Sequence, residues 1–163
     1  AEAAEQDAHK RGHITVPMIN QNDQREFLSR SAIEATEQLG VKGIITDSET
    51  GQTARNLAAF RGPHPVLAIC YKDKVQRWLN LSYGVIAVYQ HRHKSNEEMF
   101  TAALRMLRQK GYIELEDKIA YLSGTFGNGG GTTFLEINKV GDVFARKYRL
   151  HLPEGVNTGE EEA

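Results

Sequence analysis

The chain has 163 residues and a mass of 18.2 kDa; 40% of its residues are hydrophobic, 25% are charged, and the formal net charge is -1. This size predicts one globular domain, and the balanced charge argues against a nucleic-acid-binding surface or one adapted to an acidic membrane. No apolar run reaches the roughly 18–20 residues that a membrane span requires. The single cysteine, Cys70, fits a reducing compartment, so we expect a cytoplasmic protein.

The chain begins with residues 1–11, which are rich in helix formers but lack a strong apolar stripe, followed by the short apolar segment His13–Asn20. They predict a loosely attached N-terminal helix and connector. A longer helix is expected next, with Asn22 as its capping residue and Gly40 as its end. Its apolar residues recur at the spacing of one helical face, which should lie against a sheet: Leu28, Ala32, Ala35 and Leu39.

From residue 41 onward, short apolar segments alternate with amphipathic ones. The expected strands are Val41–Thr46, Val66–Cys70, Val85–Tyr89, Lys118–Leu122 and Thr132–Asn138, and the expected helices are Gln52–Arg61, Asp73–Ser82 and a longer one from Ser95 to just before Gly111. This alternation predicts an α/β fold with a largely parallel sheet covered on both faces. The last strand follows its predecessor without a helix between them, so it should run antiparallel.

These elements define an α/β domain over residues 21–140. Residues 141–163 form a C-terminal extension that we expect to be partly disordered. Its ending, "GVNTGEEEA", contains almost nothing that could be buried in a core.

The stretch "SETGQTARN", residues 48–56, follows the first expected strand and opens a helix. Ligands of open α/β sheets bind at this position, because the first helical N–H groups are unpaired and carry partial positive charge. Ser48, Thr50 and Thr53 add hydroxyl groups, Gln52 adds an amide, and Gly51 permits a close approach of the backbone. The pattern suits a phosphate group, although an ordinary capped turn explains it equally well.

A glycine-rich segment, "SGTFGNGGGTT" at residues 123–133, separates the last two expected strands. It has little intrinsic structure and could close over a small ligand. It is not a dinucleotide fingerprint, which belongs after the first strand, and no lysine completes a P-loop. We interpret it as a lid formed by Gly127, Asn128, Gly129 and Gly130.

Two other polar patterns suggest chemistry only weakly. His91 and His93 alternate beyond a strand, but no cysteine or carboxylate cluster completes a four-ligand metal site. Asp47 and Glu49 could act as an acid–base pair, yet the sequence places no nucleophile or histidine with them. Solvated or helix-capping roles are therefore expected for both carboxylates, and no metal or other cofactor is expected in this domain.

The segment "VKGIITDSETGQTARNLAAFRGPHPVLAICYKDKVQRWLNLSYGVIAV" resembles the C-terminal domain of pyruvate kinase without a gap. The family pattern is a strand, a turn rich in Ser, Thr and Gly, a helix ending in an aromatic–Arg pair, and a Pro that opens the next strand. The resemblance covers roughly residues 26–140. The positions that match are Ser48, Thr50, Gly51, Thr53, Ala54, Phe60, Arg61, Pro65 and Ala68.

This resemblance implies a three-layer α/β/α sandwich with a five-stranded mixed sheet, and a regulatory role. In the family, the effector is a sugar phosphate, chiefly fructose 1,6-bisphosphate, or AMP or ribose 5-phosphate in some bacterial members. By position, the turn Ser48–Thr53 would hold one phosphate and Lys110 would hold a second. The domain would self-associate as a dimer or tetramer.

In the same family, catalysis belongs to a separate barrel domain, and the full-length enzyme uses Mg and K ions. No such barrel fits in 163 residues, so the chain alone is not expected to be catalytic. Four positions depart from the family pattern: Glu49 places a carboxylate on the phosphate turn, Lys110 replaces an arginine of some members, Ala103 replaces a stacking tryptophan of some members, and Gly62 replaces a usual proline. The alternative that stays open is a stand-alone module without catalysis, either a structural or oligomerisation module that has lost its ligand or one that binds a phosphorylated ligand.

Overall fold

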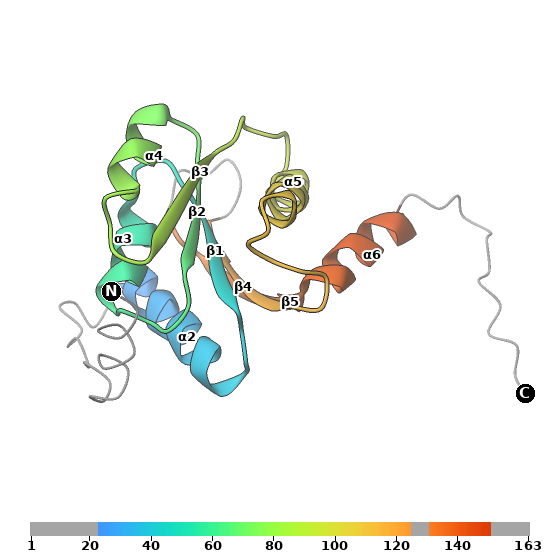
Figure 1. The fold of residues 1–163 in the computed structure, drawn as a ribbon, viewed down its shortest axis with the longest axis horizontal. Helices are drawn as coiled ribbons and strands as arrows, with labels where there is room; N and C mark the ends of the chain where they lie inside the picture. The colour runs from blue at the N-terminus through green and yellow to red at the C-terminus, as the bar shows by residue number, and fades with distance from the viewer. Residues whose placement is uncertain (1–22, 125–130, 151–163) are drawn as a thin grey trace, which may run out of the picture.

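The structure is a computed structural model, and it describes residues 23–124 and 131–150. Helices and strands alternate along most of the chain (Figure 1). Their bounds are α2 Gln24–Gln38, β1 Gly43–Ser48, α3 Gln52–Ala59, β2 Val66–Cys70, α4 Asp73–Leu79, β3 Val85–Tyr89, α5 Asn96–Gln109, β4 Lys118–Ser123, β5 Phe134–Lys139 and α6 Val140–Leu150.

The five strands form one mixed sheet in the order β3-β2-β1-β4-β5. Strand β1 pairs in parallel with β2 and β4, β2 pairs in parallel with β3, and β5 runs antiparallel to β4. The predicted fold class and the antiparallel last strand are therefore confirmed. The strand order reverses between β1 and β4, and ligands of open sheets bind at the carboxyl ends of strands at such a point.

Two separate apolar cores cover the two faces of the sheet. Helices α2, α3 and α4 pack on one face, where Ala32, Leu57 and Leu79 are fully buried. Helices α5 and α6 pack on the other face, where Leu104 and Val140 are fully buried (Figure 1). This arrangement makes the domain a three-layer sandwich, as expected.

Several helix boundaries follow from local capping chemistry. Gly40 and Gly111 adopt positive φ angles of 66° and 77° just beyond α2 and α5, as their positions in the sequence predicted. The Ser95 hydroxyl accepts a hydrogen bond from the Glu98 N–H and caps α5. The cap of α2 is Asp23 rather than Asn22, because the Asp23 carboxylate accepts hydrogen bonds from the next helical N–H groups.

Other boundaries differ from the prediction. The first strand begins and ends two residues later than expected, so Ser48 is its last residue rather than part of the loop. The last strand likewise begins at Phe134 and runs through Lys139. Helix α6 was not predicted, because residues 141–163 were assigned to a partly disordered extension and its short apolar face was not recognised. Val140 and Val143 supply that face and are buried against the sheet.

The expected N-terminal helix over residues 1–20, the lid at 127–130 and the disordered ending at 155–163 lie outside the described residues. Within the described part of the chain, no helix is long and apolar enough to cross a bilayer.

Candidate functional site at the carboxyl edge of the sheet

The turn between β1 and α3 is held in shape by its own side chains. Gly51 adopts a left-handed backbone with φ of 82°, and a Cβ added there would lie 3.1 Å from the Leu79 side chain. The Ser48 hydroxyl accepts a hydrogen bond from the Gly51 N–H at 2.7 Å. The exposed Thr50 hydroxyl accepts a longer one from the Gln52 N–H at 3.4 Å. The turn is therefore already capped internally.

Thr53 does not present its hydroxyl to solvent. Its side-chain oxygen lies 2.8 Å from that of Thr132, in the segment that leads into β5. The two residues are only 7% and 6% exposed. The Thr53 hydroxyl, which was expected to bind phosphate, therefore forms a buried hydrogen bond between two segments that are far apart in sequence.

The Gln52 side chain is exposed but also engaged. Its amide nitrogen donates to the Asn56 side chain at 3.1 Å, and its amide oxygen accepts from the Arg55 guanidinium at 2.8 Å. Arg55 in turn lies 4.1 Å above the centre of the Trp78 ring, which is 52% exposed. These contacts tie the first turn of α3 to α4, and Trp78 is a surface residue rather than an anchor in the core.

The start of α2 reaches the same edge of the sheet, which the sequence analysis missed. The Gln24 side chain donates a hydrogen bond to the Thr133 carbonyl oxygen. The Arg25 guanidinium lies so close to Gly131 that a Cβ there would be 2.9 Å from its Nη2. The Nε of Arg25 is buried without a hydrogen-bond partner among the described residues. A helix that leads into a strand must begin near that strand's carboxyl end, and this rule could have placed Arg25 here.

Lys110 does not lie with the turn. The first residue of α5, Asn96, donates a hydrogen bond to the Gly124 carbonyl oxygen and so marks the carboxyl edge of the sheet. Lys110 caps the other end of α5. At about 1.5 Å of rise per residue, a helix of this length separates Lys110 from the turn by roughly 20 Å. The proposed second phosphate ligand is therefore wrong, because α5 runs antiparallel to the strands.

A half-buried carboxylate lies near the end of the strand that leads into the turn. Asp47, near the end of β1, accepts hydrogen bonds from the Ser123 hydroxyl of β4 and from the Tyr71 hydroxyl that follows β2. Burial away from water raises the pKa of Asp47, and its two hydroxyl donors and the nearby Arg92 only partly oppose this. Asp47 was expected to be a solvated or helix-capping group; its carboxylate is instead half-buried and bonded to side chains from β4 and from the segment after β2. The same burial, with the negative charge of Asp47, raises the pKa of the Tyr71 hydroxyl.

Glu49, by contrast, is a surface group with a partner. Its carboxylate forms an ion pair with the Arg92 guanidinium, and both side chains are at least half exposed. Arg92 also lies 5.0 Å above the centre of the Tyr71 ring. The carboxylate that departs from the family pattern is therefore offset by a cation from the loop after β3.

The titration of Asp47 predicts an unusual dependence of stability on pH. In the unfolded chain its pKa is near 3.9, and in the folded protein it is higher. Between these two values only the folded protein holds the proton, so the free energy of unfolding falls as pH rises through this window. We expect Asp47→Asn to remove that fall and to be at least as stable as the parent chain at neutral pH. Urea denaturation from pH 3.5 to 8 measures both effects.

A second variant tests whether protonation of Asp47, rather than a change in packing, causes this pH dependence of stability. Ser123→Ala keeps the carboxylate but removes a hydrogen bond that favours its charged form, so the fall in stability should extend to higher pH. An Asp47→Asn protein clearly less stable than the parent at neutral pH would contradict this account.

The histidine pair and the cysteine do not form reactive sites. The His91 ring meets the Tyr89 ring edge-on at 5.2 Å. No group of three or more His, Cys, Asp or Glu able to hold a metal occurs among the described residues. Cys70 is fully buried, and burial raises the pKa of its thiol to about 11, so it is not an activated nucleophile.

The comparisons with known proteins agree on one family. The family model described as "Pyruvate kinase, alpha/beta domain" matches residues 26–138. The chain is 32% identical to a pyruvate kinase of Bacillus licheniformis over 121 residues, which are 74% of this chain and 21% of that protein. It is 34% identical to a pyruvate kinase of Borreliella burgdorferi over 122 residues, 73% of this chain and 26% of that protein.

A solved structure of Cryptosporidium parvum pyruvate kinase in complex with ADP has the same fold. It superposes with a TM-score of 0.68 at 24% identity, over 85% of this chain and 27% of that chain. The chain thus spans about a quarter of the length of its relatives. The family match, the strand order and the glycine turn after β1 together show that the chain belongs to the pyruvate kinase family and contains its C-terminal α/β domain.

Proposed function

We propose that the chain is the regulatory domain of a pyruvate kinase and that it binds the phosphate group of a small effector at the carboxyl edge of its sheet. Phosphoryl transfer from phosphoenolpyruvate to ADP then belongs to a catalytic barrel domain of the same cytoplasmic enzyme. The chain by itself is not catalytic in this proposal. It biases the enzyme through a difference in effector affinity between conformational or oligomeric states.

The observation that supports the proposal most strongly is the meeting of a left-handed glycine turn with a cation from another helix. Gly51 opens α3, whose first N–H groups carry partial positive charge. Arg25 reaches the segment at Gly131 from α2, and Thr132 in that segment contacts Thr53 of the turn. A phosphate at this edge would therefore have backbone donors on one side and a guanidinium on the other.

The internal hydrogen bonds of the turn are compatible with this role. The Gly51 N–H now donates to the Ser48 hydroxyl, and a phosphate oxygen can take that hydroxyl's place as acceptor. Exchanging one neutral acceptor for another would change the free energy of binding little. A charged phosphate oxygen accepts a stronger hydrogen bond than the Ser48 hydroxyl does, so the exchange favours binding. The pairing of Glu49 with Arg92 also reduces the repulsion that Glu49 would exert on the ligand.

Calorimetric titration of the full chain with fructose 1,6-bisphosphate, AMP and ribose 5-phosphate tests the proposal. We expect at least one of them to bind, and Arg25→Gln to weaken that binding about tenfold, as loss of one charged hydrogen bond predicts. Thr50→Ala, at the exposed part of the turn, should weaken it less. The matched control is Arg77→Gln, which removes an exposed arginine in the last turn of α4. If Arg25→Gln binds the effector as tightly as the parent chain does, the effector does not bind at this edge of the sheet.

A purely structural or oligomerisation module is the second candidate. The buried Thr53–Thr132 contact and the half-buried Asp47 carboxylate favour it, since both reduce what the edge offers to an anion. Three large side chains on or beside α4 are also exposed and could serve self-association: Trp78, Leu81 and Tyr83. Absence of binding by all three effectors at millimolar concentration, together with a concentration-dependent dimer in sedimentation, would favour this candidate.

A further inference from the structure

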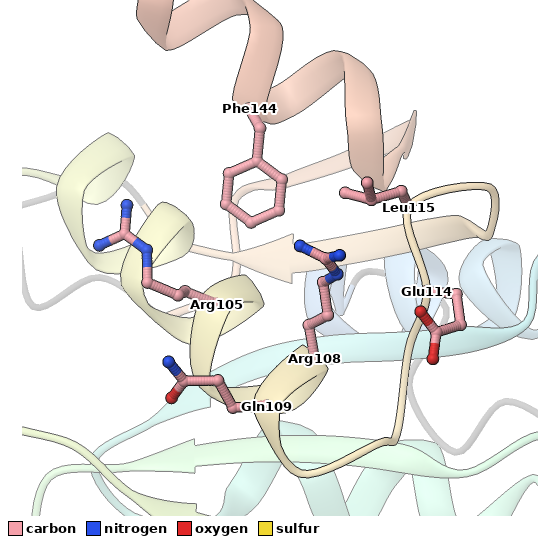
Figure 2. A pocket seen from close by; sticks show the side chains of 6 residues that line it. All are labelled: Arg105, Arg108, Gln109, Glu114, Leu115 and Phe144. Carbon is pink, nitrogen blue, oxygen red and sulfur yellow. The ribbon is translucent and has the colours of Figure 1, made fainter.

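A second concave site lies on the opposite face of the sheet, between α5 and α6. It has a volume of about 600 Å³. Figure 2 shows Phe144 reaching from α6 toward the space between two arginines of α5. The site lies away from the carboxyl edge described above, because its α5 residues belong to the end of that helix remote from Asn96. Its lining residues are Arg105, Arg108, Gln109, Glu114, Leu115 and Phe144.

The walls of this groove are held by the fold. At the start of α6, the Val140 N–H donates to the Asp117 carbonyl oxygen and the Gly141 N–H donates to the Leu115 carbonyl oxygen, each at 2.9 Å. A Cβ at Gly141 would be only 3.2 Å from that Leu115 oxygen, so glycine permits the close approach. Val143 is buried one turn later. Helix α6 is therefore fixed against the loop between α5 and β4, and the groove keeps its shape.

The two sides of the groove differ in chemistry. Arg105 and Arg108 are exposed and lie one helical turn apart, so their side chains are neighbours. Among the described residues, neither guanidinium has a carboxylate within 4.0 Å. Glu114 is the only acidic residue among the described residues that line it. The half-buried Phe144 ring and the Leu115 side chain form the apolar side.

We propose that this groove binds an organic anion that carries a planar aromatic or heteroaromatic part, up to the size of a nucleoside monophosphate. The volume lies within the range of about 300–1,000 Å³ typical of small-molecule sites. Arginine forks bind phosphate and carboxylate oxygens in pairs, and two of them one turn apart offer two such forks to one anionic group. The Phe144 ring offers a surface for stacking, and the Gln109 amide offers both a donor and an acceptor to polar atoms of the ring. Because Phe144 lies after residue 138, the groove requires an element outside the matched family domain.

Binding of phenyl phosphate to the full chain, followed through backbone amide NMR shifts, tests this inference directly. We expect shifts at Gln109, Glu114 and Leu115 and weaker binding at higher salt. The double variant Arg105→Ala/Arg108→Ala should weaken binding at least about tenfold, since both charged contacts are lost. Its matched control is Lys74→Ala/Arg77→Ala on α4, which removes two exposed cations at the same spacing from the opposite face. The control should bind as the parent does.

Further comparisons distinguish the contribution of the anionic group from that of the aromatic ring, and binding in the groove from binding at the proposed effector site. Inorganic phosphate and phenol should each bind much more weakly than phenyl phosphate. In Phe144→Leu, the affinities for phenyl phosphate and for inorganic phosphate should differ less than they do in the parent chain. Equal affinity for phenyl phosphate and inorganic phosphate would overturn the role of the ring. Shifts confined to residues 48–53 would overturn the groove while supporting the proposed effector site, and Arg25→Gln should leave binding in the groove unchanged.

Discussion

Replacing Phe100 by alanine is expected to lower the free energy of unfolding by about 3–5 kcal/mol, the usual cost of removing a buried aromatic ring. Phe100 is 5% exposed, and its ring stacks on that of Tyr121 with centroids 4.0 Å apart and planes 7° apart. Tyr121 in turn meets the Phe134 ring edge-on at 5.6 Å. The variant would leave a cavity where α5 covers β4 and β5. Urea denaturation followed by circular dichroism measures the loss.

The chain offers a matched control for this substitution. Phe27 on α2 is 60% exposed, so Phe27→Ala makes the same chemical change without opening a cavity. Surface changes of this kind usually alter stability by less than about 0.5 kcal/mol. Similar losses in the two variants would show that the rings of Phe100, Tyr121 and Phe134 do not form a buried cluster.

Gly124→Ala is expected to have the second largest effect, a loss of about 1–3 kcal/mol or more, as for other changes that overfill a packed site. A Cβ at Gly124 would overlap the carbonyl oxygen of Gly131, a backbone atom that no rotamer change can move. This overlap can be relieved only if the segment before β5 shifts. That shift would stretch the hydrogen bond from the Thr133 N–H to the Ser123 carbonyl oxygen and disturb the Thr132 contact with the turn.

Gly43→Ala is the control for Gly124→Ala. A Cβ at Gly43 would make ordinary contacts at 3.7 Å, and the residue lies in a strand where alanine is tolerated. We expect little loss of stability in this variant. If Gly124→Ala unfolds at the same denaturant concentration as Gly43→Ala, the close approach between the ends of β4 and the segment at Gly131 does not exist in solution.

Local pattern predicted most of the fold. Largely apolar segments of five to seven residues, separated by amphipathic segments and glycines, predicted all five strands and four of the helices, because these signals act over a few residues. The helix stops at Gly40 and Gly111 followed from glycine's access to positive φ. Boundaries were less accurate, and α6 was missed because its buried stripe is short.

The candidate site was predicted only in part. The turn at Ser48–Thr53 was found because strand, glycine and hydroxyls are adjacent in sequence. Its surroundings come from distant segments: Arg25 from α2, Thr132 from the approach to β5, and Ser123 from β4. Lys110 was assigned by a positional match that ignored the direction of α5.

The sequence by itself determined the family, the alternation of strands and helices and the glycine turn after the first strand, since each depends on residues a few positions apart. Only the tertiary structure decided which side chains meet at that turn, that Ser123 and Tyr71 bond the half-buried Asp47, and that α5 and α6 form a groove lined by two arginines. The physical reason is the same in each case. Contacts between segments many residues apart depend on the order and direction of strands in the sheet, and local spacing does not encode either.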